Sequence, residues 1–218
     1  MFFDILLPMP STTPSPFQGR SRVLSAVLLL TALAACGESA PAEDVEPAWE
    51  VLEDGHPGGL LLSVGGHGPD DVWAVGGRPG ETLVLRGSAD ADRLSRIAAP
   101  GAETAWWVCA LGDDATAIVG EGGMVLLDRG EGLTALETGL SGTLYGCWGT
   151  GPDDFWIVGG DAQQGLPELT HVGPEGPSAP DLGALVPQLP NVLYKVWGID
   201  DHLWVVGDAG TVLSRDTD

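Results

Sequence analysis

The feature that most constrains the fold of this chain is a motif that occurs four times between residues 64 and 207. Each copy has two aspartates, a mainly apolar run and then Val-Gly, and its closing glycine is Gly76, Gly120, Gly159 or Gly207. Consecutive copies are therefore 44, 39 and 48 residues apart. Periods of this length are typical of β-propeller blades, each of which is a four-stranded sheet. The repeat predicts an all-β protein with four similar sheets.

Turn residues divide each copy into four short strands, here named A to D in chain order. Strands A and B are apolar on both faces, as in Val72–Val75, which is typical of a sheet that is covered on both sides. Strand D alternates apolar and polar residues, which suits the outer rim of a blade. The best examples are Leu144–Trp148 for strand A, Phe155–Val158 for strand B, Met124–Asp128 and Thr211–Arg215 for strand C, and Leu94–Ile97 and Leu133–Glu137 for strand D.

The fourth copy ends after its strand C, at Arg215, whereas Trp49–Leu52 precedes the first copy and has no strand partners of its own. An open stack of four sheets would expose two apolar faces, which soluble proteins avoid. We therefore expect a closed four-bladed β-propeller over residues 49–218. In this arrangement Trp49–Leu52 is strand D of the last blade and pairs beside Val212.

Residues 23–36 form an apolar segment that follows Arg20 and Arg22 and ends in small residues before a cysteine. About 13 apolar residues are too few to span a bilayer, which takes about 20, and this order of features is typical of a secretory signal peptide. The alternative is a buried helix or strand. We expect residues 1–35 to be the signal peptide. Residues 36–48 are rich in proline, alanine and acids, which predicts a disordered acidic tether after the cysteine.

The end of the apolar segment, Leu33-Ala34-Ala35-Cys36, resembles the lipobox of bacterial lipoproteins. The resemblance implies that Cys36 is lipidated and becomes the mature N-terminus, and Gly37 resembles the outer-membrane class of Gram-negative lipoproteins. Several acyl chains would anchor the protein durably, since each buried methylene contributes about 0.8 kcal/mol. The resemblance predicts a lipid-anchored protein of the outer membrane that faces the periplasm or the cell surface.

The chain is strongly acidic, with 31 acidic and 9 basic residues and a net charge of -22. Removal of the expected signal peptide would leave 30 acidic and 7 basic residues. Nucleic acids and anionic lipid headgroups both require dense positive charge, so the composition argues strongly against them as partners. It is compatible with cationic partners, with calcium or simply with solubility.

Over residues 49–218, the pattern Trp-Gly…Asp-x-Trp-x-Val-Gly…Gly resembles secreted Gram-negative bacterial lipoproteins with tandem β-propeller repeats, and loosely resembles tectonin-type lectins. Ala117 replaces the tryptophan in the second copy. The resemblance implies a non-catalytic module that binds a protein or glycan of the cell envelope. The alternatives are a structural or assembly lipoprotein of the outer membrane and, with least support, a polysaccharide-active enzyme. No Gly-x-Ser-x-Gly, phosphate-loop or Cys-x-x-Cys motif occurs, and we predict no catalytic residues and no cofactor.

Five tryptophans recur at two positions of the repeat and could form a platform on which sugar rings stack. The alternative, which we favour, is packing between blades, because strands A and B are central and large aromatic residues dominate protein cores. The tryptophans are Trp73, Trp156 and Trp204 at one position and Trp148 and Trp197 at the other.

Aspartate pairs precede strand B in every copy, and ring closure would bring all of them to one face. Clustered carboxylates bind calcium, but Gly-Pro-Asp-Asp is also ordinary turn sequence in which aspartate bonds its own backbone, and we favour the turn. The four histidines share no repeat spacing, so we predict no metal site. The pairs are Asp70/Asp71, Asp113/Asp114, Asp153/Asp154 and Asp200/Asp201, and the histidines are His56, His67, His171 and His202.

The third copy departs from the others in two loops that are expected on the same face of the blade. Its B–C loop, Gly160–Gly165, is enlarged, and the connection Gly183–Asn191 to the fourth copy is the longest between copies. Binding residues are often carried by loops on a rigid scaffold, although loops without a function are an equal alternative. The candidate ligand-binding residues are Asp161, Gln163, Gln164, Gln188 and Asn191.

Cys109 and Cys147 lie in the inner strands of the second and third copies, one residue out of phase in the repeat. Since side chains alternate along a strand, either both enter the interface between those blades or both point away from it. A disulfide requires Cα atoms within about 7 Å, whereas packed sheets lie about 10 Å apart. We therefore expect two buried free thiols rather than a disulfide, which remains the alternative.

Overall fold

A computed structural model of the protein describes residues 49–52, 54–161, 163–183, 185, 189, 191–200 and 202–216. The expected signal peptide, Cys36 and the tether lie outside these residues. Residues 48–218 form one compact unit. In the described part of the chain, no helix is long and apolar enough to cross a membrane.

The strands of this unit form four antiparallel sheets, each built from strands that are consecutive in the chain. The first sheet contains β1 (Leu60–Gly68), β2 (Asp71–Arg78), β3 (Glu81–Gly87) and β4 (Ser95–Arg96). The second contains β5 (Ala105–Leu111), β6 (Ala115–Gly120), β7 (Val125–Asp128) and β8 (Thr134–Ala135). The third contains β9 (Thr143–Gly151), β10 (Asp154–Asp161), β11 (Leu166–Gly173) and β12 (Gly176–Ser178), and the fourth contains β13 (Leu193–Ile199), β14 (His202–Gly207) and β15 (Val212–Asp216).

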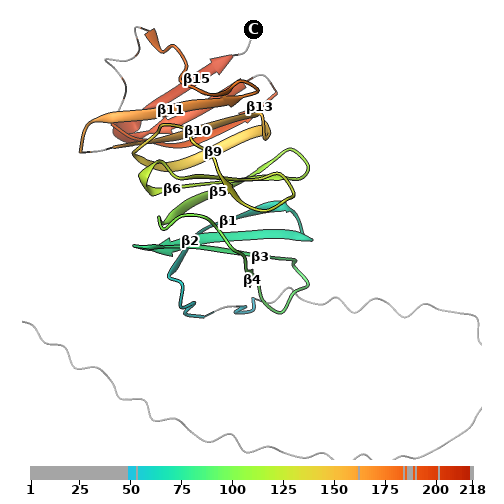
Figure 1. Ribbon diagram of the computed structural model, residues 1–218. Helices are drawn as coiled ribbons and strands as arrows, with labels where there is room; N and C mark the ends of the chain where they lie inside the picture. The colour runs from blue at the N-terminus through green and yellow to red at the C-terminus, as the bar shows by residue number, and fades with distance from the viewer. Residues whose placement is uncertain are drawn as a thin grey trace, which may run out of the picture. The chain divides into compact units, whose positions relative to one another are not determined.

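The four sheets are stacked face to face in chain order, with the first sheet at the bottom of Figure 1 and the fourth at the top. This arrangement confirms the predicted all-β fold and its division into repeated sheets. The predicted strands A, B and C coincide with observed strands to within a few residues. Strand D is shorter than predicted, because β4 and β8 have only 2 residues each.

The core lies between the sheets, because alternate residues of each strand point to opposite faces and both faces of an inner sheet are covered. Trp73 and Val75 of β2 pack against Ile118 of the second sheet. Phe155 and Ile157 of β10 face the second sheet. The neighbouring residues of β10 face the other way and pack against the fourth sheet.

The innermost strand of each sheet carries a β-bulge, in which one residue has no partner in the next strand. The aromatic rings of the bulged residues form a ladder from sheet to sheet, which we call the bulge ladder. The ring centroids of Trp106 and Tyr145 are 5.2 Å apart, and those of Tyr145 and Tyr194 are 5.4 Å apart. The residues that bulge near the start of these four strands, and that define the ladder, are Leu62, Trp106, Tyr145 and Tyr194.

The expected ring closure by Trp49–Leu52 is wrong. These residues form no strand, Trp49, Val51 and Leu52 are exposed, and the fourth sheet has three strands among the described residues. The cause lies at the opposite end of the stack, where the segment that follows Leu52 in the chain covers the first sheet. Gly58 is buried, and a Cβ atom at this position would lie 2.9 Å from Leu83 Cδ1. This packing holds the N-terminal segment at the first sheet, so the second and third sheets separate it from β15.

The expectation of two free thiols is also wrong, because Cys109 and Cys147 form a disulfide. Both residues belong to the core between the second and third sheets, so both side chains do enter the same interface. Their Cα atoms are 6.0 Å apart, well below the usual distance between packed sheets. The reason is that both lie on innermost strands, β5 and β9, where neighbouring sheets approach one another most closely.

Candidate functional site

The turns that join the first two strands of each sheet lie along one edge of the stack, which we call the turn edge. Contacts between neighbouring sheets define it. His67 Nε2 is 2.9 Å from the carbonyl oxygen of Ala115, and Arg129 Nη2 donates to Asp153 Oδ1 at 2.7 Å. The described members of the repeated aspartate pairs are therefore on one side of the molecule.

In the first sheet, Asp71 organises the turn edge. Its carboxylate accepts hydrogen bonds from Trp73 Nε1 at 3.0 Å and from Arg86 Nε at 2.6 Å, and lies 2.7 Å from His67 Nδ1. The guanidinium of Arg86 lies over the Trp73 ring, 4.4 Å from its centroid. Burial raises the pKa of Asp71, but the hydrogen bonds from His67, Trp73 and Arg86 outweigh it and lower the pKa below its ordinary value. Asp71 thus holds side chains across strands, which differs from the self-contained turn that we favoured.

The third sheet repeats this arrangement with a histidine in place of the arginine. Asp154 accepts a hydrogen bond from Thr150 Oγ1 at 2.5 Å and lies 2.8 Å from His171 Nε2. The imidazole of His171 stacks on the Trp156 ring, with centroids 4.7 Å apart. The bonds from Thr150 and then His171 lower the pKa of Asp154, which keeps this carboxylate ionised.

A groove of about 320 Å³ opens on the turn edge between the third and fourth sheets. We call it the turn-edge groove. The guanidinium of Arg215 enters it from β15 and lies 5.0 Å from the Trp156 ring centroid, and His202 Nδ1 is 2.6 Å from Asp216 Oδ1 at its side. The lining residues are Trp148, Thr150, Asp154, Trp156, His171, Asp200, His202, Leu203 and Arg215.

The corresponding space between the first two sheets is occupied by protein side chains. Arg86 takes the strand position of His171, and Asp128 takes that of Arg215, as the strand registers show. Arg86 Nη1 is 3.6 Å from Asp128 Oδ2, so the long arginine side chain reaches the aspartate across the interface. His171 is shorter than arginine, and the Arg215 guanidinium turns toward Trp156, which leaves the turn-edge groove open.

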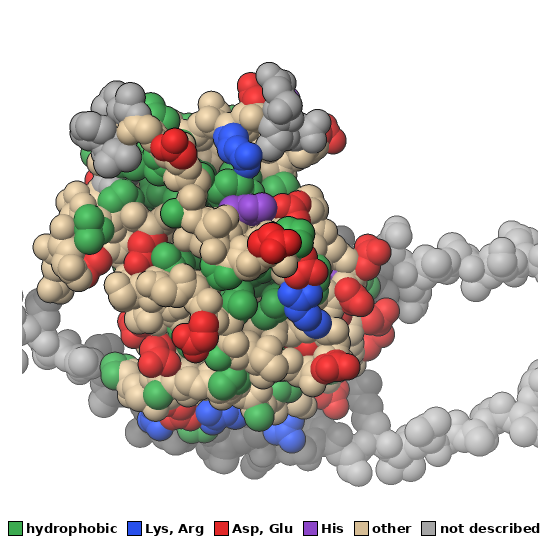
Figure 2. Space-filling view, turned by 45° about the horizontal axis from the view of Figure 1, so that its top comes forward, with side chains coloured by type: hydrophobic (Ala, Val, Ile, Leu, Met, Phe, Trp, Pro, Cys, Tyr) green, Lys and Arg blue, Asp and Glu red, His purple; other side chains and the backbone are tan. Residues whose placement is uncertain are grey.

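The turn-edge groove combines aromatic rings with hydrogen-bonding groups of both kinds. Asp154 and Asp200 supply acceptors and Arg215 supplies donors, while His171 and His202 each hold one ring nitrogen against an aspartate, Asp154 and Asp216 respectively. Figure 2 shows many more Asp and Glu than Lys and Arg side chains on the face that it draws. Such a groove suits a small polar ligand with an apolar side.

The predicted ligand-binding residues that the structure describes lie at the opposite ends of these strands, along what we call the loop edge. Asp161 accepts hydrogen bonds from the backbone nitrogens of Gln163 and Gln164, and from Gln164 Nε2 at 2.6 Å. The Gln164 bonds lower the pKa of Asp161. Asn191 lies beside this loop, since a Cβ atom on Gly165 would be 3.3 Å from its Oδ1. The two loops therefore meet. Gln188 lies outside the described residues. That a ligand binds at this site remains a prediction.

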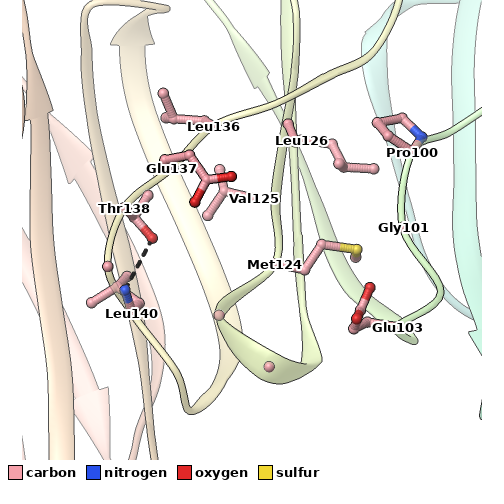
Figure 3. A pocket seen from close by; sticks show the side chains of 14 residues that line it. Pro100, Gly101, Glu103, Met124, Val125, Leu126, Leu136, Glu137, Thr138 and Leu140 are labelled. Atoms are coloured by element: carbon pink, nitrogen blue, oxygen red, sulfur yellow. Dashed lines mark hydrogen bonds between the residues drawn. The ribbon is translucent and has the colours of Figure 1, made fainter.

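A second cavity, of about 300 Å³, lies on the loop edge of the second sheet (Figure 3). Its walls are the connections that carry Glu103 on one side and Glu137 on the other, with Met124 at the centre. Leu140 N donates to Thr138 Oγ1 at 3.3 Å within one wall. In the part of the chain that is described, no group of three or more His, Cys, Asp or Glu side chains could hold a metal ion.

Searches with this sequence found no matching protein-family model and no matching curated protein. The groove must therefore be interpreted from its own chemistry.

Sequence reasoning missed His171, His202 and Arg215 as neighbours in one groove. A signal was present in the repeat, because strand C places a basic residue opposite the tryptophan of strand B in two copies. Arg86 pairs with Trp73, and His171 pairs with Trp156. The position of Arg215 against Trp156 depends on contact between two sheets, so no pattern in the sequence indicates it.

Lys195, the only lysine in the chain, lies on β13 among aromatic rings of the inner strands. Its Nζ donates to the carbonyl oxygen of Tyr145 and lies 3.4 Å from the Trp107 ring centroid. Burial lowers the pKa of Lys195 to about 8. Between pH 8 and the ordinary value of 10.5, the unfolded chain therefore binds a proton that the folded chain has lost, and stability rises with pH.

We expect Lys195→Met to raise the free energy of unfolding at pH 7 by about 1 kcal/mol, because it removes a partly buried charge and keeps an apolar stem. The advantage over the parent should shrink as the pH rises from 8 to 10.5. Urea unfolding at several pH values measures both effects. Lys195→Arg, which stays charged, is the control, and its free energy of unfolding should show no such pH dependence. If the free energies of unfolding of the parent and of Lys195→Met change with pH in parallel, the prediction is contradicted.

Proposed function

We propose that this protein is a membrane-tethered, non-catalytic binding module of the cell envelope, and that the turn-edge groove binds a glycan. The observation that carries the proposal is the meeting of aromatic rings, ionised carboxylate, imidazoles and guanidinium in one open groove. Sugars present hydroxyls that both donate and accept hydrogen bonds, together with apolar ring faces. The half-buried Trp148 offers an apolar wall, and Asp154 and Arg215 offer an acceptor and a donor.

The stack itself is proposed to be a run of consecutive β-propeller blades. The period of the repeat, the face-to-face packing of the sheets and the close approach of their innermost strands support this view. A rigid stack of this kind keeps the two walls of the groove at a fixed distance. Pre-formed walls lower the entropy cost of binding.

A glycan array probed with the full chain carrying Cys36→Ser tests the proposed ligand. We expect a defined set of glycans to bind, and Arg215→Ala to weaken binding about 10-fold or more through loss of charged hydrogen bonds. Gln163→Ala, on the loop edge, is the matched control and should bind like the parent.

The outcomes separate the competing functions. If Gln163→Ala loses glycan binding and Arg215→Ala binds like the parent, the binding site is at the predicted loop-edge residues and not in the turn-edge groove. An array without hits, combined with defined envelope proteins that co-purify from detergent extracts, would favour a structural or assembly lipoprotein. Shortened glycans after incubation would favour a polysaccharide-active enzyme.

The proposed anchor is Cys36, supported by the signal-peptide pattern and the lipobox resemblance. We expect Cys36→Ser to release the protein from membranes, because the acyl chains supply the attachment. Fractionation of cells that express the parent and the variant measures the effect. Ser25→Ala, inside the apolar segment, is the control and should stay with the outer membrane; a Cys36→Ser variant that remains there too would refute the lipid anchor.

A further inference from the structure

The outer face of the fourth sheet is apolar, and no other described residues of the same copy cover it. Trp197 of β13 is 55% exposed and Val212 of β15 is 65% exposed, and Ile199 and Val206 beside them are also exposed. The Trp197 ring stacks on that of Trp204, with centroids 5.7 Å apart. Together these residues make a continuous apolar surface, which we call the tail face.

The same strand positions are covered in the third sheet. Trp197 pairs with Trp204 as Trp148 pairs with Trp156. In the third sheet, Trp156 and Val158 pack against Leu193, Val196 and other residues of the fourth. The tail face therefore has the side chains of an internal interface and lacks only the sheet that would cover it.

The first sheet presents the other half of such an interface. Val64 of β1 is 70% exposed, and Leu61 on the same face of the strand is exposed as well, whereas Leu60 and Leu62 line a cavity with Trp106 of the second sheet. The outer strands of this sheet are already covered, since Leu83 and Leu85 are buried. We call the exposed surface of β1 the head face. Innermost strands pack against one another at each internal interface, as β5 does on β9.

The bulge ladder ends without a partner at both faces. Tyr145 contacts a ladder ring on each side, whereas Tyr194 contacts only Tyr145 and is exposed at the tail, and Leu62 is exposed at the head. Both ends therefore present exposed apolar residues.

We propose that the tail face of one copy docks on the head face of a second copy, head to tail. The occupant is a second copy because the tail face repeats strand positions that are covered inside the chain, and β1 at the head repeats the position of the strands that meet inside it, β5 and β9. Tyr194 of one copy then continues the bulge ladder to Leu62 of the other. Two such contacts, related by a twofold axis, join two stacks of four sheets into a closed ring and leave neither apolar face exposed.

The mass of the full chain carrying Cys36→Ser, measured by sedimentation equilibrium at several concentrations, tests the proposal. We expect twice the monomer mass. Trp197→Asp on the tail and Val64→Asp on the head should each raise the dissociation constant about 10-fold or more. Leu166→Asp, at a 57% exposed leucine of β11 outside both faces, is the matched control and should remain a dimer.

A mixture of the two variants distinguishes the geometry. The Val64→Asp variant keeps an unaltered tail face, and the Trp197→Asp variant keeps an unaltered head face. If the contact is head to tail, the mixture should therefore form a heterodimer through one intact contact. A parent chain that sediments as a monomer, or a Val64→Asp variant that dimerises like the parent, would overturn the proposal. The second result would indicate contact between two tails. Far-UV circular dichroism on each variant checks that the sheets are intact.

Discussion

Replacing both Cys109 and Cys147 by alanine is expected to lower the free energy of unfolding by about 4 kcal/mol. The disulfide closes a loop with a sequence separation of 38, and the chain-entropy relation for a loop of that length gives this value. Both residues are also buried between the second and third sheets, so the bond fastens two repeats together. Urea unfolding in a Cys36→Ser background measures the loss.

Two controls accompany the disulfide experiment. Thiol counting on the denatured, unreduced Cys36→Ser protein should find no free thiol. Addition of a reductant to this protein should reproduce most of the destabilisation, because it breaks the bond while keeping both side chains. A double alanine variant as stable as its background would show that the crosslink contributes little.

Trp73→Ala is expected to lower the free energy of unfolding by about 3–5 kcal/mol, the usual cost of removing a large buried aromatic side chain. Trp73 is fully buried between the first and second sheets. The substitution also removes the ring under the Arg86 guanidinium and the donor to Asp71. These losses add to the cavity that alanine leaves.

Trp49→Ala provides the matched control for this experiment, because the same side chain is fully exposed at that position. It should change the free energy of unfolding by no more than about 0.5 kcal/mol. Thermal and urea unfolding of both variants give the comparison. Equal effects at the two positions would mean that the first two sheets do not pack through Trp73.

Much of the local structure could be predicted from residues close together in the chain. Asp-Asp turns, apolar runs such as Val72–Val75 and closing glycines indicated where strands begin and end, and the observed strands agree. The phase difference between Cys109 and Cys147 correctly predicted that their side chains either both enter the interface between their sheets or both point away from it. These inferences hold because alternation along a strand and turn chemistry depend on neighbouring residues.

The candidate site could be predicted only in part. The repeated tryptophans were expected to pack between sheets, which Trp73 and Trp156 do, whereas Trp197 is exposed. The two loops of the third copy meet beside Asn191 as their lengths suggested. The turn-edge groove was missed, because it depends on how far His171 and Arg215 reach across an interface between two sheets.

The amino-acid sequence alone therefore determined that the protein is built from repeated antiparallel sheets, and which residues of each strand share a face. The tertiary structure alone decided how the stack ends, where Trp49–Leu52 lies and that the two cysteines approach within bonding distance. The physical reason is the range of the interactions. Strand pairing follows from short turns, whereas the spacing and closure of stacked sheets depend on side-chain volumes that meet only after distant segments have packed together.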